Sequence, residues 1–131
     1  MEKELRNTVG AVGNYNSVPT SITSVASVVT MVNGLSITKK ADKEIWADGV
    51  LTYTIVVTND ADETYEAPVV TDVLDTTLVE FVDESVTIDS VTAASSEYNY
   101  DTGTNTLTIN LQDIVASSSK TIEFKVTKKT I

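Results

Sequence analysis

The chain has 131 residues and a formal net charge of −10, from 19 acidic and nine basic residues. This length is sufficient for one domain with a hydrophobic core, and the negative field would repel nucleic acid and anionic membranes. The absence of histidine and cysteine excludes a histidine-based hydrolase triad, disulfide bonds and a thiolate metal site.

Valine and threonine dominate the composition, with 19 and 21 residues, and they alternate along much of the chain. This bias favours half-buried strands over helices, and no stretch shows a sustained helical repeat of apolar residues. Short strands separated by turn signals predict an all-β fold, an immunoglobulin-like antiparallel β-sandwich.

The N-terminal part predicts two strands. In the first, four side chains share one face: Leu5, Asn7, Val9 and Ala11. Residues 13–16 have the composition of a turn, and residues 22–32 form the second candidate strand, which ends at an Asn-Gly pair. The longest nearly apolar run, residues 25–32, is too short to span a bilayer.

The remaining chain predicts a longer series of strands. They cover residues 35–39, 53–59, 70–74, 79–82, 86–88, 98–100, 107–111 and 121–127. Two charged residues fall on inward faces of this series, Lys39 in the first strand and Asp72 in the third. Trp46, before the second strand, is interpreted as a core or edge plug.

The series ends without a closing strand, while the N-terminal strands have no partner. The sequence therefore predicts a donor-strand extension over residues 1–33 and a sandwich over residues 34–131 that the N-terminal donor segment completes. An open sandwich exposes apolar core and unpaired backbone groups. If each subunit supplies the strand that its neighbour lacks, the product is a fibre.

Lys39, Asp72 and Asn7 occupy inward positions on three different strands. A buried lysine loses its charge readily, and a buried carboxyl group tends to keep its proton. A neutral amine can attack an asparagine carboxamide, with the acid polarising the carbonyl, to give an isopeptide bond and ammonia. Two alternatives remain open: a buried Lys39–Asp72 ion pair, and a lysine that extends to the sandwich edge.

Two loops have some resemblance to calcium sites. Residues 101–105 lack a bidentate acid at the spacing of an EF-hand, so a glycine-containing hairpin turn is the better interpretation. Residues 59–63 are interpreted as a solvated loop. The sequence therefore predicts no metal and no cofactor.

Several segments together carry a family resemblance. They are Leu-Ser-Ile-Thr-Lys at 35–39, a strand from Gly49 to a Thr-Asn pair at Asn59, Val-Thr-Asp-Val-Leu at 70–74, the hairpin at 100–110 and Ile-Glu-Phe-Lys-Val at 122–126. In this order, residues 35–127 resemble the DUF11 family of bacterial surface-protein repeats. The proline that the family has after the third segment is replaced by Asp75.

The resemblance implies an immunoglobulin-like repeat and adds weight to the cross-link. Arrays of such repeats continue past the last strand of this chain with a closing hairpin, and the segments at 6–9 and 24–32 resemble that hairpin, placed before the domain. Some domains of this kind carry Lys–Asn isopeptide bonds between their first and last strands. The bond would join Lys39 and Asn7 here, with Asp72 as the assisting acid.

The expectation is a non-enzymatic structural subunit of an extracellular or spore-surface fibre, which polymerises by N-terminal donor-strand exchange. Its partners would be copies of itself and an anchoring protein, without nucleic acid or membrane insertion. The first residues are charged and not followed by an apolar segment, so no signal peptide is visible. The alternatives are a stalk repeat excised from a large adhesin and a carbohydrate- or calcium-binding sandwich module.

Overall fold

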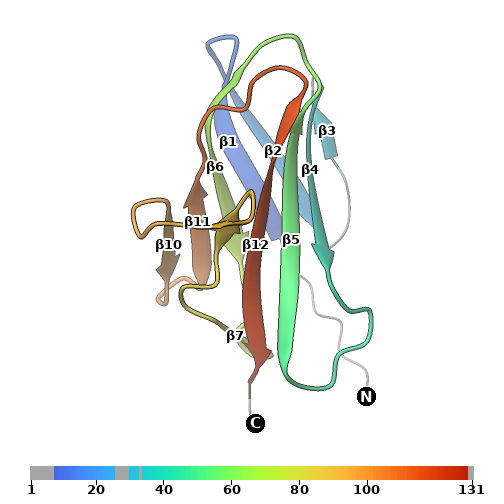
Figure 1. Cartoon of the computed structure of the whole chain (residues 1–131), viewed down its shortest axis with the longest axis vertical. Coiled ribbons are helices and arrows are strands. Elements are labelled where there is room, and N and C mark those ends of the chain that lie inside the picture. Colours follow the sequence, from blue (N-terminus) through green and yellow to red (C-terminus); the bar gives the residue numbers. More distant parts are fainter. Residues whose placement is uncertain (1–7, 26–29, 33, 130–131) are drawn as a thin grey trace.

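The computed structural model describes residues 8–25, 30–32 and 34–129. Within these residues the fold is all-β, with two antiparallel sheets packed face to face and no helix (Figure 1). The expected immunoglobulin-like β-sandwich is therefore confirmed at the level of the fold.

The first sheet has five strands in the order β10-β11-β6-β1-β2. Their bounds are β1 (Thr8–Tyr15), β2 (Val18–Val25), β6 (Tyr65–Val73), β10 (Tyr98–Asp101) and β11 (Thr106–Asn110). The hairpin predicted around residues 98–111 is formed by β10 and β11, and it lies at one edge of this sheet.

The second sheet has the order β3-β4-β5-β12-β8-β9, and β7 pairs with β12 beside this path. Its strands are β3 (Thr30–Val32), β4 (Leu35–Ala41), β5 (Val50–Asn59), β7 (Val79–Phe81), β8 (Thr87–Ile88), β9 (Val91–Thr92) and β12 (Ser118–Lys128). The long strands β5 and β12 pair over ten residues and form the centre of this sheet.

The core lies between the two sheets and consists of the alternate side chains that each strand turns inward. Strand β5 shows the alternation most clearly, because every second residue from Leu51 to Asn59 is buried. The largest fully buried side chains come from both sheets; they are Tyr65, Phe124, Ile22, Leu35, Ile37, Ile55, Leu107, Ile109, Ile114 and Ile122.

Strands β1 and β2 of the N-terminal segment are part of the first sheet, whereas its strand β3 belongs to the second. Strand β1 lies between β6 and β2 and pairs with both, so the hairpin of β1 and β2 covers the side of β6 that β11 leaves free (Figure 1). Val9 and Ala11 turn into the core, where 2% and 1% of their surfaces are exposed. Within one chain, the segment expected to act as a donor occupies the open place in its own sandwich; Leu5 and Asn7 lie outside the described residues.

Candidate functional site: a lysine and a carboxylate between the sheets

Lys39 and Asp72 meet in the middle of the core. Lys39 is on β4 of the second sheet, on the face it shares with Leu35 and Ile37, and Asp72 is on β6 of the first sheet. The Lys39 Nζ atom lies 2.7 Å from Asp72 Oδ2, and the exposed fractions of the two side chains are 2% and 0%. The two inward positions predicted from the sequence therefore form one ion pair that joins the sheets.

Two aromatic rings border the lysine. Tyr53 on β5 and Phe124 on β12 are cross-strand neighbours, with ring centroids 5.4 Å apart. The Lys39 Nζ atom lies 4.2 Å from the Tyr53 centroid and 5.6 Å from that of Phe124. The two rings exclude water from the Lys39 amine. The electrostatic attraction between the amine and the ring faces is weak and replaces the lost hydration only in part.

Burial shifts the pKa of both members of the pair toward the neutral forms. It lowers the pKa of Lys39, against the opposing effect of the nearby Asp72 charge. It raises the pKa of Asp72 to about 6, again against the effect of Lys39. Burial, with a further contribution from Asp72, also raises the pKa of Tyr53 to about 12. Burial thus shifts both groups in the direction of an amine and a carboxylic acid, which are the forms that amide chemistry needs.

The pair has spare hydrogen-bonding capacity. Apart from their contact with each other, Lys39 Nζ and the two carboxylate oxygens of Asp72 have no hydrogen-bond partner in the part of the chain that the structure describes. Buried polar groups are almost always satisfied, so an unpaired Oδ1 and an ammonium with a single partner indicate a place for one more polar group.

Strand β1 passes directly beside the pair. Val9 is the cross-strand partner of Asp72, and Thr8 is the partner of Val73. Asn7, the third member of the predicted site, lies outside the described residues, so the structure brings together two of the three predicted residues. It also adds Tyr53 and Phe124, which the sequence did not assign to the site; their only signal was that both alternate inward.

The other candidate sites have structural explanations. Asp101 Oδ1 accepts hydrogen bonds from the backbone N–H groups of Gly103 and Thr104, as in an ordinary Asx turn. The Asn59 side chain donates to the carbonyls of Glu63 and Ile114 and ties two loops together. No group of three acidic side chains suited to a metal ion occurs in the described residues.

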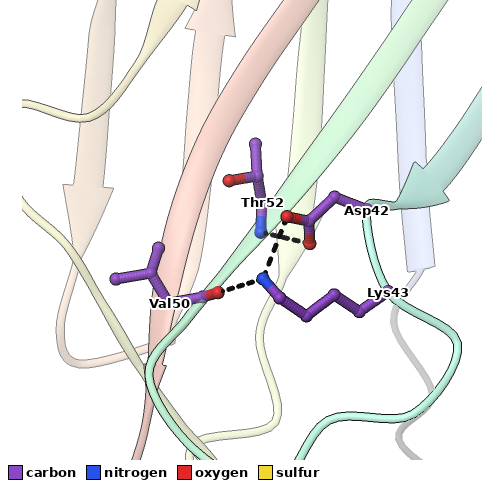
Figure 2. Close-up of polar contacts among 4 residues, drawn as sticks. All are labelled: Asp42, Lys43, Val50 and Thr52. Atoms are coloured by element: carbon purple, nitrogen blue, oxygen red, sulfur yellow. Dashed lines mark hydrogen bonds and ion pairs between the residues drawn. The ribbon is translucent and has the colours of Figure 1, made fainter.

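An exposed ion pair near the start of β5 contrasts with the buried one. Asp42 accepts hydrogen bonds from the Lys43 ammonium and from the Thr52 backbone N–H, both 3.0 Å long, and Lys43 also donates to the Val50 carbonyl (Figure 2). The Thr52 bond, followed by the one from Lys43, lowers the pKa of Asp42. Asp42 and Lys43 have polar partners and are exposed to solvent, so this cluster fastens the loop between β4 and β5 and contains no buried, unpaired group.

Comparisons with known proteins give no relative: no family model, curated protein or solved structure matches the chain. The DUF11 resemblance therefore stays an expectation from the sequence. Among the described residues, no helix is long and apolar enough to cross a membrane.

Proposed function

We propose that the protein is a structural fibre subunit, that neighbouring subunits exchange their N-terminal strands, and that Lys39 becomes linked to Asn7 of the exchanged segment. The observation that carries this proposal is the buried Lys39–Asp72 pair, with an unpaired carboxylate oxygen, beside the strand that the N-terminal segment contributes.

The exchanged unit would be a hairpin. Strands β1 and β2 are joined by Asn16 and Ser17, whose φ angles of 50° and 62° form the tight two-residue turn typical of a stable hairpin. All contacts of β1 with β6 can form equally well between two chains, because exchange of an identical element preserves every native contact. Exchange of the hairpin between two chains therefore costs little free energy beyond the ordering of the segment that connects the hairpin to β4.

The chemistry of the link uses the three groups in defined roles. The neutral Lys39 amine attacks the Asn7 side-chain carbonyl carbon, and protonated Asp72 donates a hydrogen bond to the carbonyl oxygen. A new C–N bond forms, the bond to the amide nitrogen breaks, and one lysine proton leaves with that nitrogen as ammonia. Asp72 carries the proton between the two nitrogens and is regenerated.

The position of Val9 makes Asn7 the appropriate electrophile. Val9 is buried and opposite Asp72, and residues two apart on a strand share a face. Continuation of β1 by one residue, to the position two before Val9, would bring Asn7 to the core face near the end of β6. An amide there would supply the polar group that the Lys39–Asp72 pair lacks.

The test is denaturing electrophoresis and mass spectrometry of the full chain after concentration and incubation. A ladder of oligomers that survives boiling in detergent, with a Lys39–Asn7 branched peptide lacking one ammonia, supports exchange with cross-linking. Lys39→Ala should abolish the ladder, whereas Lys120→Ala, which removes a half-exposed lysine paired with Asp89, should leave it intact.

Two results would contradict the proposal in different ways. A monomer that has lost one ammonia means that the bond closes within a chain, as in an isolated stalk repeat. A monomer of unchanged mass, with no fibres in electron micrographs, means that Lys39 and Asp72 are only a buried ion pair.

A further inference from the structure

The pairing of β1 with β6 contains one irregularity, a β-bulge on β6. Between two regular stretches of pairing, the single residue Gly13 of β1 lies opposite two residues of β6, Ala67 and Pro68. Proline has no N–H group for the strand ladder, and Ala67 has a positive φ angle of 39°, which persists only where the surroundings hold it. Because a bulge interrupts a strand at one defined position, it can fix the register of the strand that pairs with it.

The bulge is held from the side opposite to β1. The Ala67 backbone N–H donates a hydrogen bond of 2.8 Å to Asp113 Oδ1, and the Leu111 N–H donates one of 2.9 Å to the Pro68 carbonyl. Leu111 and Asp113 belong to the connection between β11 and β12. The shape of the bulge is therefore supported by contacts within the body of the sandwich, without the hairpin of β1 and β2.

Gly13 fits against the bulge because it has no side chain. A Cβ atom at this position would lie 3.0 Å from the Glu66 carbonyl oxygen and 3.2 Å from Tyr65 Cζ, closer than ordinary van der Waals contact. A side chain here would force the two backbones apart. Every other inward-facing residue of β1 carries a side chain; they are Val9, Ala11 and Tyr15.

Tyr65 contacts the second strand of the hairpin at the same level. Its Cζ atom lies next to Gly13, and its hydroxyl donates a hydrogen bond of 3.1 Å to the carbonyl of Thr20, the cross-strand partner of Gly13. The Tyr65 side chain is fully buried, and burial raises its pKa to about 12, so the hydroxyl keeps the proton that it donates. One side chain of β6 thus contacts both strands of the hairpin.

These contacts distinguish registers that hydrophobic alternation does not. A slip of β1 by one residue would turn its apolar side chains outward, but a slip by two residues keeps every inward residue inward. In a slip by two, a residue with a side chain would face the bulge. Leu5 or Val9 would then replace Asn7 at the position two residues before the partner of Asp72.

We infer that the bulge of β6 and the Tyr65 hydroxyl fix the register in which the N-terminal hairpin docks, whether the hairpin belongs to the same chain or to a second copy. This docking surface accepts a hairpin that has glycine opposite the bulge and a backbone carbonyl beside it on the second strand. The consequence for the link rests on the proposed function: the same register brings Asn7 to Lys39, so Tyr65 and Asp113 are positioning residues for that reaction.

The test measures the register in the dilute full chain by NMR. NOEs between the α-protons of Val9 and Asp72, which are cross-strand partners, identify the native register, and amide hydrogen exchange measures how often the hairpin opens. Gly13→Ala should lower the protection of β1 and β2 at least about tenfold and add NOEs displaced by two residues, because a methyl group overpacks the bulge. Gly10→Ala, the same substitution at an outward position of β1, should change neither.

Asp113 offers a matched pair of variants outside the hairpin. Asp113→Ala removes the acceptor of the Ala67 N–H and should lower the protection of β1 and β2 severalfold, with displaced NOEs. Asp113→Asn keeps a side-chain oxygen that can accept this hydrogen bond and should restore both properties. Tyr65→Phe, which loses only the hydroxyl group, should behave like Asp113→Ala.

Three results would overturn the inference. They are equal effects of Gly13→Ala and Gly10→Ala, an unchanged register and protection in both Tyr65→Phe and Asp113→Ala, and loss of protection without displaced NOEs, which means that these groups stabilise docking without choosing its register. None of the measurements needs the Lys39–Asn7 bond. Displaced NOEs in Gly13→Ala, in a protein that never forms the bond, would support the inference and contradict the proposed function.

Discussion

At the scale of single residues, the Lys39–Asp72 pair is the feature that separates this sandwich from an ordinary one. Two buried charges that have only each other as polar partners among the described residues stabilise a fold poorly, because the desolvation cost offsets most of their attraction. An apolar pair of similar volume would pack between Tyr53 and Phe124 without that cost. The pair therefore adds little to stability, and under the proposed function its role is chemical.

The raised pKa of Asp72 predicts an unusual pH dependence. Burial moves this pKa from 3.8 to about 6, so between these pH values folded subunits hold a proton that the unfolded chain has released. Stability of the subunit should fall as the pH rises from about 4 to about 6, by up to about 3 kcal/mol. Urea unfolding of dilute subunits across this range measures the effect.

The matched variant is Asp72→Asn, which keeps the shape and removes the titrating group. Its stability should change less with pH over the same interval than that of the wild type. Parallel profiles for the two proteins would show that Asp72 titrates near its ordinary pKa and is not tuned for acid catalysis.

At the scale of elements, alternation of apolar residues predicted most strands and the inward faces of the site. Lys39, Asp72 and every second residue from Tyr53 to Asn59 are buried as expected, because a strand has only two faces and one of them is the core. The aromatic neighbours of Lys39 could not be assigned, since they depend on which strands pair, and strand order is not encoded in local alternation.

The turn of the N-terminal hairpin was predicted too early. The structure has it at Asn16 and Ser17, while Gly13 lies within β1 at an irregularity in its pairing with β6. A Cβ atom on Gly13 would lie 3.0 Å from the Glu66 carbonyl oxygen and 3.1 Å from Pro68 Cα. Glycine is needed here for the close approach of two backbones, a requirement that a sequence cannot distinguish from a turn.

Strand β1 offers a matched pair of substitutions with opposite expected results. Val9→Asp buries a second carboxylate opposite Asp72 and should cost several kcal/mol, so that the hairpin no longer docks. Val12→Asp, on the outward face of the same strand, should change subunit stability by less than about 1 kcal/mol. Urea midpoints of the two variants, with electron microscopy for fibre growth, make the comparison; similar losses would mean that Val9 does not face the core.

At the scale of the whole molecule, the N-terminal hairpin supplies two of the five strands of one sheet. Its removal would leave β6 as a bare edge and expose Val70 and Tyr65 from the core, in a chain without disulfides. The hairpin is joined to the remaining chain only through the segment before β4. Without the hairpin, the remaining strands are still joined by one continuous chain. The part of the core that β1 and β2 cover would, however, be exposed.

This arrangement predicts the behaviour of a chain that lacks residues 1–33. We expect it to aggregate or to stay soluble without forming ordered fibres, and to regain a dispersed amide NMR spectrum when a peptide of residues 1–33 is added. The reason is that the peptide can restore both the pairing with β6 and the buried side chains of Val9 and Ala11. A truncated chain that forms ordered fibres by itself would contradict strand exchange. A truncated chain that is fully stable and does not bind the peptide would show that the sandwich does not need the hairpin for folding, whether the hairpin comes from the same chain or from a neighbour.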